Sequence, residues 1–167
     1  MTLTTHGIAG ALISGVLINQ PLIGLPLAFG SHFFLDAFPH RDYQILSLDK
    51  ISAGRGVIVM NRGKDFTLDL IRIGFDGILG LLIVWFFSTL ASPGAFYLVI
   101  LGGVLGMMPD ALQFIYGKYR FKFLAPIQNF HSHIHTDIRF KNSLIWGVGS
   151  QLLLIILMAL FWLWYFK

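Results

Sequence analysis

The sequence contains no cysteine, which excludes disulfides, thiolate metal ligands and a cysteine nucleophile. It contains no glutamate either: all eight acidic residues are aspartate, so any carboxylate chemistry must use aspartate side chains. Charged residues are scarce, at 12% of the chain against about 25% in an ordinary soluble domain. With 56% of its 167 residues hydrophobic, the chain has the composition of an integral membrane protein.

The basic residues are concentrated in two polar connections between apolar segments. The net charge is +4, which in a soluble protein would suggest nucleic-acid binding. Here ten of the twelve basic residues lie within 39–65 and 117–142, and the turns near residues 19 and 92 contain none. This is the positive-inside pattern. It predicts a multi-pass membrane protein in contact with lipid and not with nucleic acid, with both connections and the N-terminus in the cytoplasm.

Five apolar segments predict an all-α integral membrane bundle with about five transmembrane segments. The first two, 7–19 and 21–38, are shorter than the roughly 20 residues that cross a bilayer, and we interpret them as a tight hairpin. The predicted single domain consists of hairpin 1 (6–38), a cytoplasmic loop (39–65), hairpin 2 (66–116), a histidine-rich loop (117–142) and a last helix (143–166).

A short internal repeat suggests that the two hairpins are similar. The eight residues from His6, HGIAGALI, match the eight from Asp76, DGILGLLI, at five positions. Extending the repeat aligns Asp36 with Asp110, so each hairpin would bring two polar groups to the same end of the bundle. A chance match between short apolar sequences is the alternative.

The second apolar segment ends in side chains that hydrocarbon does not tolerate. In a helix, His32, Asp36 and His40 recur every four residues and lie on one face. Imidazole and carboxylate together form the donor set of a first-row metal site, and ionisable groups in a membrane segment point to function. The alternative is a solvated helix end, with His40 among the lipid headgroups.

The second hairpin contains further candidates. Asp76 shares a helical face with Arg72, and an ion pair between the two side chains is one interpretation. The other is that Asp76 binds the metal or holds a metal ligand in place. Asp110 follows Pro109, which frees a backbone carbonyl at a depth where irregular backbone is tolerated only if it lines a site. Gln113, one turn later, would hold a ligand or a substrate oxygen.

The sequence HSHIHTD, residues 131–137, is the most specific feature. In an extended backbone all three histidines and Asp137 project to one side, whereas in a helix only His131 and His135 share a face. Three histidines within five residues favour a metal site. A pH-sensing or headgroup-binding loop is the alternative.

Together these features resemble the bacterial inner-membrane metal-dependent hydrolase family. The resemblance rests on a His-Gly pair in the first short segment, aspartates at the ends of the second and fourth segments, and a late histidine cluster. Family members typically carry a Pro-Asp-x-Asp-His-like string and a later His-Arg-Gly-x-Thr-His-like string. Their counterparts here are LDAFPH (35–40), with the Pro-Asp pair at 109–110 instead, and HSHIHT (131–136). The resemblance implies a hydrolase in the bacterial inner membrane.

We therefore expect a divalent metal at the cytoplasmic end of the bundle, with zinc favoured and manganese or a two-metal site as alternatives. The expected ligands are drawn from His6, Asp36, Asp110 and His131 or His135, with His32 beside them. The expected general base is Asp76 or His133. The residues expected to contact substrate are His40, Arg41, Gln113 and Arg139.

The expected activity is hydrolysis of an amphiphilic substrate, such as a phospholipid or a lipid-linked ester or phosphoester, at the cytoplasmic face. A metal-binding or ion-translocating membrane protein without hydrolytic activity is the alternative, because paired hairpins with intramembrane aspartates also occur in transporters. A scaffold whose polar residues only hold helices together is a third interpretation.

Overall fold

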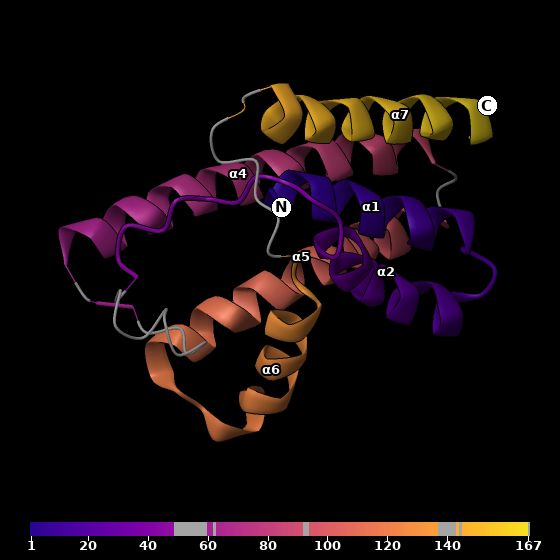
Figure 1. Cartoon of the computed structure of the whole chain (residues 1–167). Helices are drawn as coiled ribbons and strands as arrows, with labels where there is room; N and C mark the ends of the chain where they lie inside the picture. The colour runs from indigo at the N-terminus through magenta and orange to yellow at the C-terminus, as the bar shows by residue number, and fades with distance from the viewer. Residues whose placement is uncertain (49–59, 62, 92–93, 137–142, 144, 167) are drawn as a thin grey trace.

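The computed structural model describes residues 1–48, 60–61, 63–91, 94–136, 143 and 145–166, and this part of the chain is helical. The helices are α1 (Leu3–Val16), α2 (Pro21–Asp36), α4 (Lys64–Leu90), α5 (Phe96–Tyr119), α6 (Ala125–Ile134) and α7 (Ser150–Tyr165). A short 3₁₀ turn (Lys122–Leu124) precedes α6, and a π-helical turn (Ile145–Gly149) precedes α7. The predicted all-α class is confirmed for the described residues (Figure 1).

Three helices are long and apolar enough to cross a membrane: α4 with 27 residues, α5 with 24, and the continuous helix Ile145–Tyr165 with 21. The other two predicted spans form α1 and α2, which have only 14 and 16 residues. These lengths fall below the roughly 20 residues that a crossing requires. The structure thus supports three of the five predicted spans by length, and the count of five is not confirmed.

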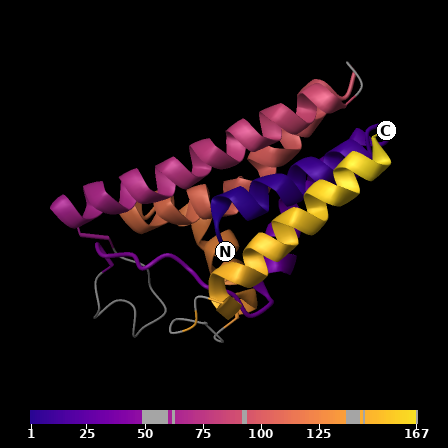
Figure 2. The ribbon, with the colours of Figure 1, turned by 90° about the horizontal axis from the view of Figure 1, so that it is seen from above.

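Helix α1 lies at the centre of the bundle, between α4 and α7, and packs against α2 and α5 as well (Figure 2). Glycines bring α1 and α5 into backbone contact. A Cβ atom on Gly106 would overlap the carbonyl oxygen of His6, and one on Gly10 would overlap the carbonyl oxygen of Gly102. Small residues at such crossings let helices approach closely in a membrane. This contact holds the start of α1 against the middle of α5.

The first hairpin reaches only part of the way along the bundle. Thr4, near the start of α1, hydrogen-bonds to Asp76, which lies near the middle of α4. The end of α2 lies beside the start of α1, because the two helices form an antiparallel pair (Figure 1). Their polar ends therefore meet inside the bundle, alongside the central turns of α4 and α5.

An apolar core fills the bundle on the other side of this meeting point, towards the C-terminal ends of α1 and α4. It is formed by α1, α4, α5 and α7, and its buried members include Ile8, Val84, Val99 and Trp162. Trp162 is 1% exposed and Val84 and Val99 are fully buried. The polar ends of the first hairpin are thus separated from the far end of the molecule by packed side chains.

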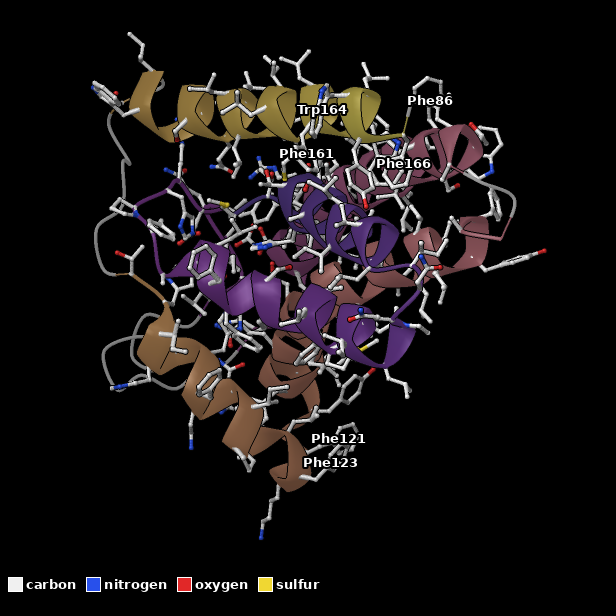
Figure 3. All side chains as sticks on the ribbon, turned by 90° about the vertical axis from the view of Figure 1, so that its right-hand side faces the viewer. Phe86, Phe121, Phe123, Phe161, Trp164 and Phe166 are labelled. Carbon is white, nitrogen blue, oxygen red and sulfur yellow. The ribbon has the colours of Figure 1, made fainter. Side chains whose placement is uncertain are left out.

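One predicted boundary and one predicted loop need correction. Hairpin 1 does not remain helical to residue 38: α2 ends at Asp36, because Pro39 disfavours helical backbone at the residue before it. The histidine-rich connection is not a plain loop, since it contains α6, which returns from the end of α5 towards the bundle (Figure 1). Phe121 and Phe123 lie at this turn with 45% and 76% of their surface exposed (Figure 3).

Candidate metal centre

Asp36, the last residue of α2, lies at the centre of the histidine cluster and is 1% exposed. Five imidazole Nε2 atoms lie within 4 Å of its carboxylate oxygens: His131 at 3.0 Å, His6 and His32 at 3.2 Å, His40 at 3.5 Å and His135 at 3.9 Å. These histidines come from α1, α2, α6 and the segments that follow α2 and α6. One buried carboxylate thus connects distant parts of the chain.

The first ligand group (His32, Asp36, Asp110 and His131) brings together α2, α5 and α6. Each residue offers one ligand atom, and these four atoms all lie within 4.8 Å of one another. The Nε2 atom of His32 is 3.5 Å from Oδ1 of Asp110 and 3.3 Å from Nε2 of His131. Three of the four residues are buried, and Asp110 is 22% exposed. Two imidazoles and two carboxylates at this spacing are a suitable donor set for a divalent metal.

Backbone carbonyls orient the imidazoles. Nδ1 of His32 lies 2.9 Å from the carbonyl oxygen of Gly106, and Nδ1 of His40 lies 2.7 Å from that of Phe38. A carbonyl only accepts, so in each pair the Nδ1 atom carries the hydrogen. The lone pair of a neutral ring is then on Nε2, which faces Asp36. Metal-binding histidines show the same arrangement, in which the second ring nitrogen donates to a carbonyl or carboxylate.

His6 supports the interpretation that a cation belongs in this cluster. Its side chain is fully buried, and neither ring nitrogen has a hydrogen-bond partner among the described residues, although Nε2 is 3.2 Å from Asp36. Its ring stacks on that of His32 at a centroid distance of 3.9 Å. Buried polar atoms are nearly always paired, and an exception at a functional site indicates an ion or a catalytic role. The residues present therefore fit a metal.

The second ligand group (Asp36, His40 and His135) shares Asp36 with the first, and its three ligand atoms also lie within 4.8 Å of one another. Asp42 borders it, with Oδ1 2.6 Å from Nε2 of His40 and Oδ2 3.6 Å from Nε2 of His135. The amino group of Met1 lies 2.9 Å from Oδ1 of Asp36 and 3.2 Å from Oδ1 of Asp42. His135 and Asp42 are 17% and 20% exposed, close to the 22% of Asp110, so each side of the cluster has a partly exposed residue.

Ion pairing shifts the pKa values of Asp42 and His135. Burial raises the pKa of Asp42, but hydrogen bonds from His135 and His40 outweigh it, and the net shift is downward. Burial lowers the pKa of His135, but its hydrogen bond to Asp42 and the carboxylate charges outweigh it, and the net shift is upward. Both shifts favour an anionic Asp42 beside a cationic partner.

The structure brings together all six residues expected as metal ligands and adds His40, which was expected to contact substrate. It does not bring the two expected bases to the cluster. Asp76 accepts hydrogen bonds from the backbone and hydroxyl of Thr4 and from the hydroxyl of Tyr43. His133 is exposed on α6, since the helical spacing directs only His131 and His135 towards Asp36.

Two of the other residues expected to bind substrate, Gln113 and Arg41, are half-buried. The backbone carbonyl oxygen of Arg41 accepts a hydrogen bond from the side chain of Gln151 at 2.9 Å. Arg139 lies outside the described residues.

Asp42 was missed as a member of the cluster, although its position two residues after His40 would have suggested it. The carbonyl of Gly106 was also missed, and no sequence signal identifies it.

No model of a known protein family matches this chain, and neither a curated protein nor a solved structure was found that matches it.

Proposed function

We propose that this protein is a membrane-bound metal-dependent hydrolase that acts on a lipid or lipid-linked ester or phosphoester at the cytoplasmic side of the bacterial inner membrane. The observation that carries the proposal is the convergence of His32, Asp36, Asp110 and His131 within 4.8 Å, with His32 fixed by a backbone carbonyl. The ligand types favour zinc, with manganese as the alternative.

The charge balance supports a bound cation. With Nδ1 of His32 protonated, its neutral ring directs the Nε2 lone pair towards the Asp36 carboxylate at 3.2 Å and towards Nε2 of His131 at 3.3 Å. Such an arrangement is repulsive unless a proton or a metal ion lies between these atoms. Asp36 and Asp110 both belong to this ligand group, and their two negative charges favour a divalent metal ion over a single proton.

A divalent metal bound by these residues would lower the pKa of a coordinated water to near neutrality and polarise the scissile group. The chain supplies the remaining functions. Asp110 is the least buried member of the first ligand group at 22% exposure, and we assign to its carboxylate oxygen that does not bind metal the role of accepting a proton from the attacking water. This proposal replaces Asp76 and His133, the bases expected from the sequence. His6 closes the buried side of the cluster and excludes solvent there.

The site suits an amphiphilic substrate because it lies alongside apolar helices that face lipid. Exposed apolar residues on α2, α4 and α5 include Phe34, Phe75, Leu101 and Ile115. Five of the described basic residues lie before or at the start of α4 and at or just after the end of α5: Arg41, Lys64, Lys118, Arg120 and Lys122. By the positive-inside rule these ends of α4 and α5 face the cytoplasm. A phosphate headgroup would meet these cations as it approached the cluster.

Ion translocation is the second candidate, because the cluster lies beside the middle of α4 and α5 rather than at their ends. A transporter requires access to such a site from both sides. The apolar core with Val84, Val99 and Trp162 occupies the space towards the far end of the bundle. This packing favours access to the histidine cluster from one side of the membrane only. Such one-sided access supports hydrolysis over transport.

The test is metal analysis combined with an activity screen. The protein is purified in detergent without chelators, and its metal content is measured by elemental mass spectrometry for wild type, Asp36→Ala and Asp110→Ala. We expect bound zinc or manganese in the wild type, loss in both variants, and metal-dependent hydrolysis of phosphoester or ester lipids by the wild type alone. A folded wild type that binds no divalent metal would refute the proposal.

A further inference from the structure

Asp36 uses its two carboxylate oxygens towards different partners. Oδ2 faces His32 at 3.2 Å and His131 at 3.0 Å, both in the first ligand group. Oδ1 faces His40 of the second ligand group at 3.5 Å and His6 at 3.2 Å, whereas His135 of the second group lies 3.9 Å from Oδ2. Both ligand groups thus share Asp36, and the nearest imidazoles of the two groups lie on different oxygens, as in a carboxylate that bridges two ions.

The second ligand group is oriented as firmly as the first. Nδ1 of His40 is tied to the carbonyl oxygen of Phe38 at 2.7 Å, and Nδ1 of His135 to that of Thr136 at 3.1 Å. Both Nε2 atoms therefore face the carboxylates. His135 is 3.9 Å from Asp36 and 3.6 Å from Asp42, so it reaches both acidic residues.

The structure also shows that a positive charge fits between these two carboxylates. The amino group of Met1 lies 2.9 Å from Oδ1 of Asp36 and 3.2 Å from Oδ1 of Asp42. Nε2 of His40 lies 3.5 Å and 2.6 Å from the same two Oδ1 atoms. Binding of a metal ion between these carboxylates would require Met1 to move aside or to coordinate it.

We infer that the protein holds two divalent cations bridged by Asp36: one in the first ligand group, and one bound by Asp36, His40, Asp42 and His135. The inference rests on the proposed function for the first ion and adds the second. Two-metal sites in hydrolytic enzymes have ions about 3.5–4 Å apart that act on the attacking and leaving oxygens together. The second ion would lie beside Asp42 and His135, which are 20% and 17% exposed.

The test uses Mn²⁺, because two manganese ions that share a carboxylate are magnetically coupled. The metal-free full-length protein in detergent is titrated with Mn²⁺, and its metal content and electron paramagnetic resonance spectrum are measured. We expect about two ions per chain and a coupled spectrum in the wild type. His40→Ala should hold about one ion with an uncoupled six-line spectrum, Asp36→Ala should hold none, and His133→Ala, on the exposed face of α6, should match the wild type.

The wild-type spectrum decides the inference even if a variant fails to fold. A wild type that saturates at one uncoupled ion, held equally well by His40→Ala, overturns the second site and leaves the first ion and the hydrolase proposal intact. A wild type that binds no Mn²⁺ or Zn²⁺ overturns both. A coupled wild-type pair that persists in folded His40→Ala and His135→Ala would also overturn this ligand assignment.

Discussion

The Nδ1 atom of His32 on α2 lies 2.9 Å from the carbonyl oxygen of Gly106 on α5. The same glycine is the point where α5 touches the backbone of His6 on α1. One residue without a side chain therefore sets the distance between two helices and also orients a buried imidazole. Helix packing and ligand orientation are coupled at this position.

Gly106→Ala should disturb both properties. The added Cβ would overlap the carbonyl oxygen of His6, so α1 and α5 must separate. Overpacking of this kind typically costs about 1–3 kcal/mol of stability. Loss of a group that orients a metal ligand typically weakens metal binding by about 10–100-fold. We expect a lower melting temperature in detergent and a metal affinity reduced by at least ~10-fold, measured by competition with a chromogenic chelator.

Gly30→Ala is the matched control, because Gly30 precedes His32 on α2 and a Cβ there meets nothing within 4 Å. It should leave metal affinity unchanged and, as glycine to alanine within a helix, should not lower stability. Equal metal affinities for the two alanine variants would show that the Gly106 contact does not orient the site.

His131→Ala and His133→Ala should differ sharply in metal content, although the two residues are only two positions apart on α6. His131 is 3% exposed and 3.0 Å from Asp36, whereas His133 is exposed. We expect His131→Ala to lose the metal from the first ligand group, and His133→Ala to keep wild-type metal content by elemental analysis. Similar loss in both would mean that the helical spacing of α6 does not select the ligand.

Much of this arrangement follows from sequence patterns. The hydrophobic runs predict α4, α5 and the last helix, and the shortness of the first two runs is confirmed by α1 and α2. The four-residue spacing of His32 and Asp36 predicts that they share a face, and both join one ligand group. These features depend on local periodicity and length, which the sequence states directly.

The remaining features depend on contacts between distant segments. Asp76 was a candidate base because of its position in the repeat, but Thr4 and Tyr43 occupy its carboxylate. α6 lacks the long apolar run that marks the other helices, so its pattern resembled that of a loop. That His131 and His135 face Asp36 while His133 is exposed depends on the helical form of α6. Only tertiary structure settles such pairings, because each needs two segments to meet.

Asp76→Ala should lower stability while the protein retains its metal. The carboxylate accepts hydrogen bonds from the backbone nitrogen of Thr4 at 3.1 Å, from its hydroxyl at 2.8 Å, and from Tyr43. Leaving such buried donors without a partner costs about 1–3 kcal/mol for each group. We expect a lower melting temperature for Asp76→Ala, a smaller decrease for Tyr43→Phe, and unchanged metal content in both. Loss of metal from a folded Asp76→Ala would instead return Asp76 to the site.

Single-cysteine labelling should establish which end of the bundle faces the cytoplasm, because the chain has no cysteine of its own. Asn19 and Asn129 make a matched pair: both are exposed, and they lie at opposite ends of the bundle, in the turn after α1 and on α6. Lys118, Arg120 and Lys122 lie in the same connection as Asn129, and the turn with Asn19 contains no basic residue, so the positive-inside rule places Asn129→Cys in the cytoplasm and Asn19→Cys outside. In intact bacterial cells, a membrane-impermeant maleimide should label Asn19→Cys and leave Asn129→Cys unlabelled until the membrane is opened. The reverse result would place the connection that contains α6 on the outer side and would contradict the proposed hydrolysis at the cytoplasmic face.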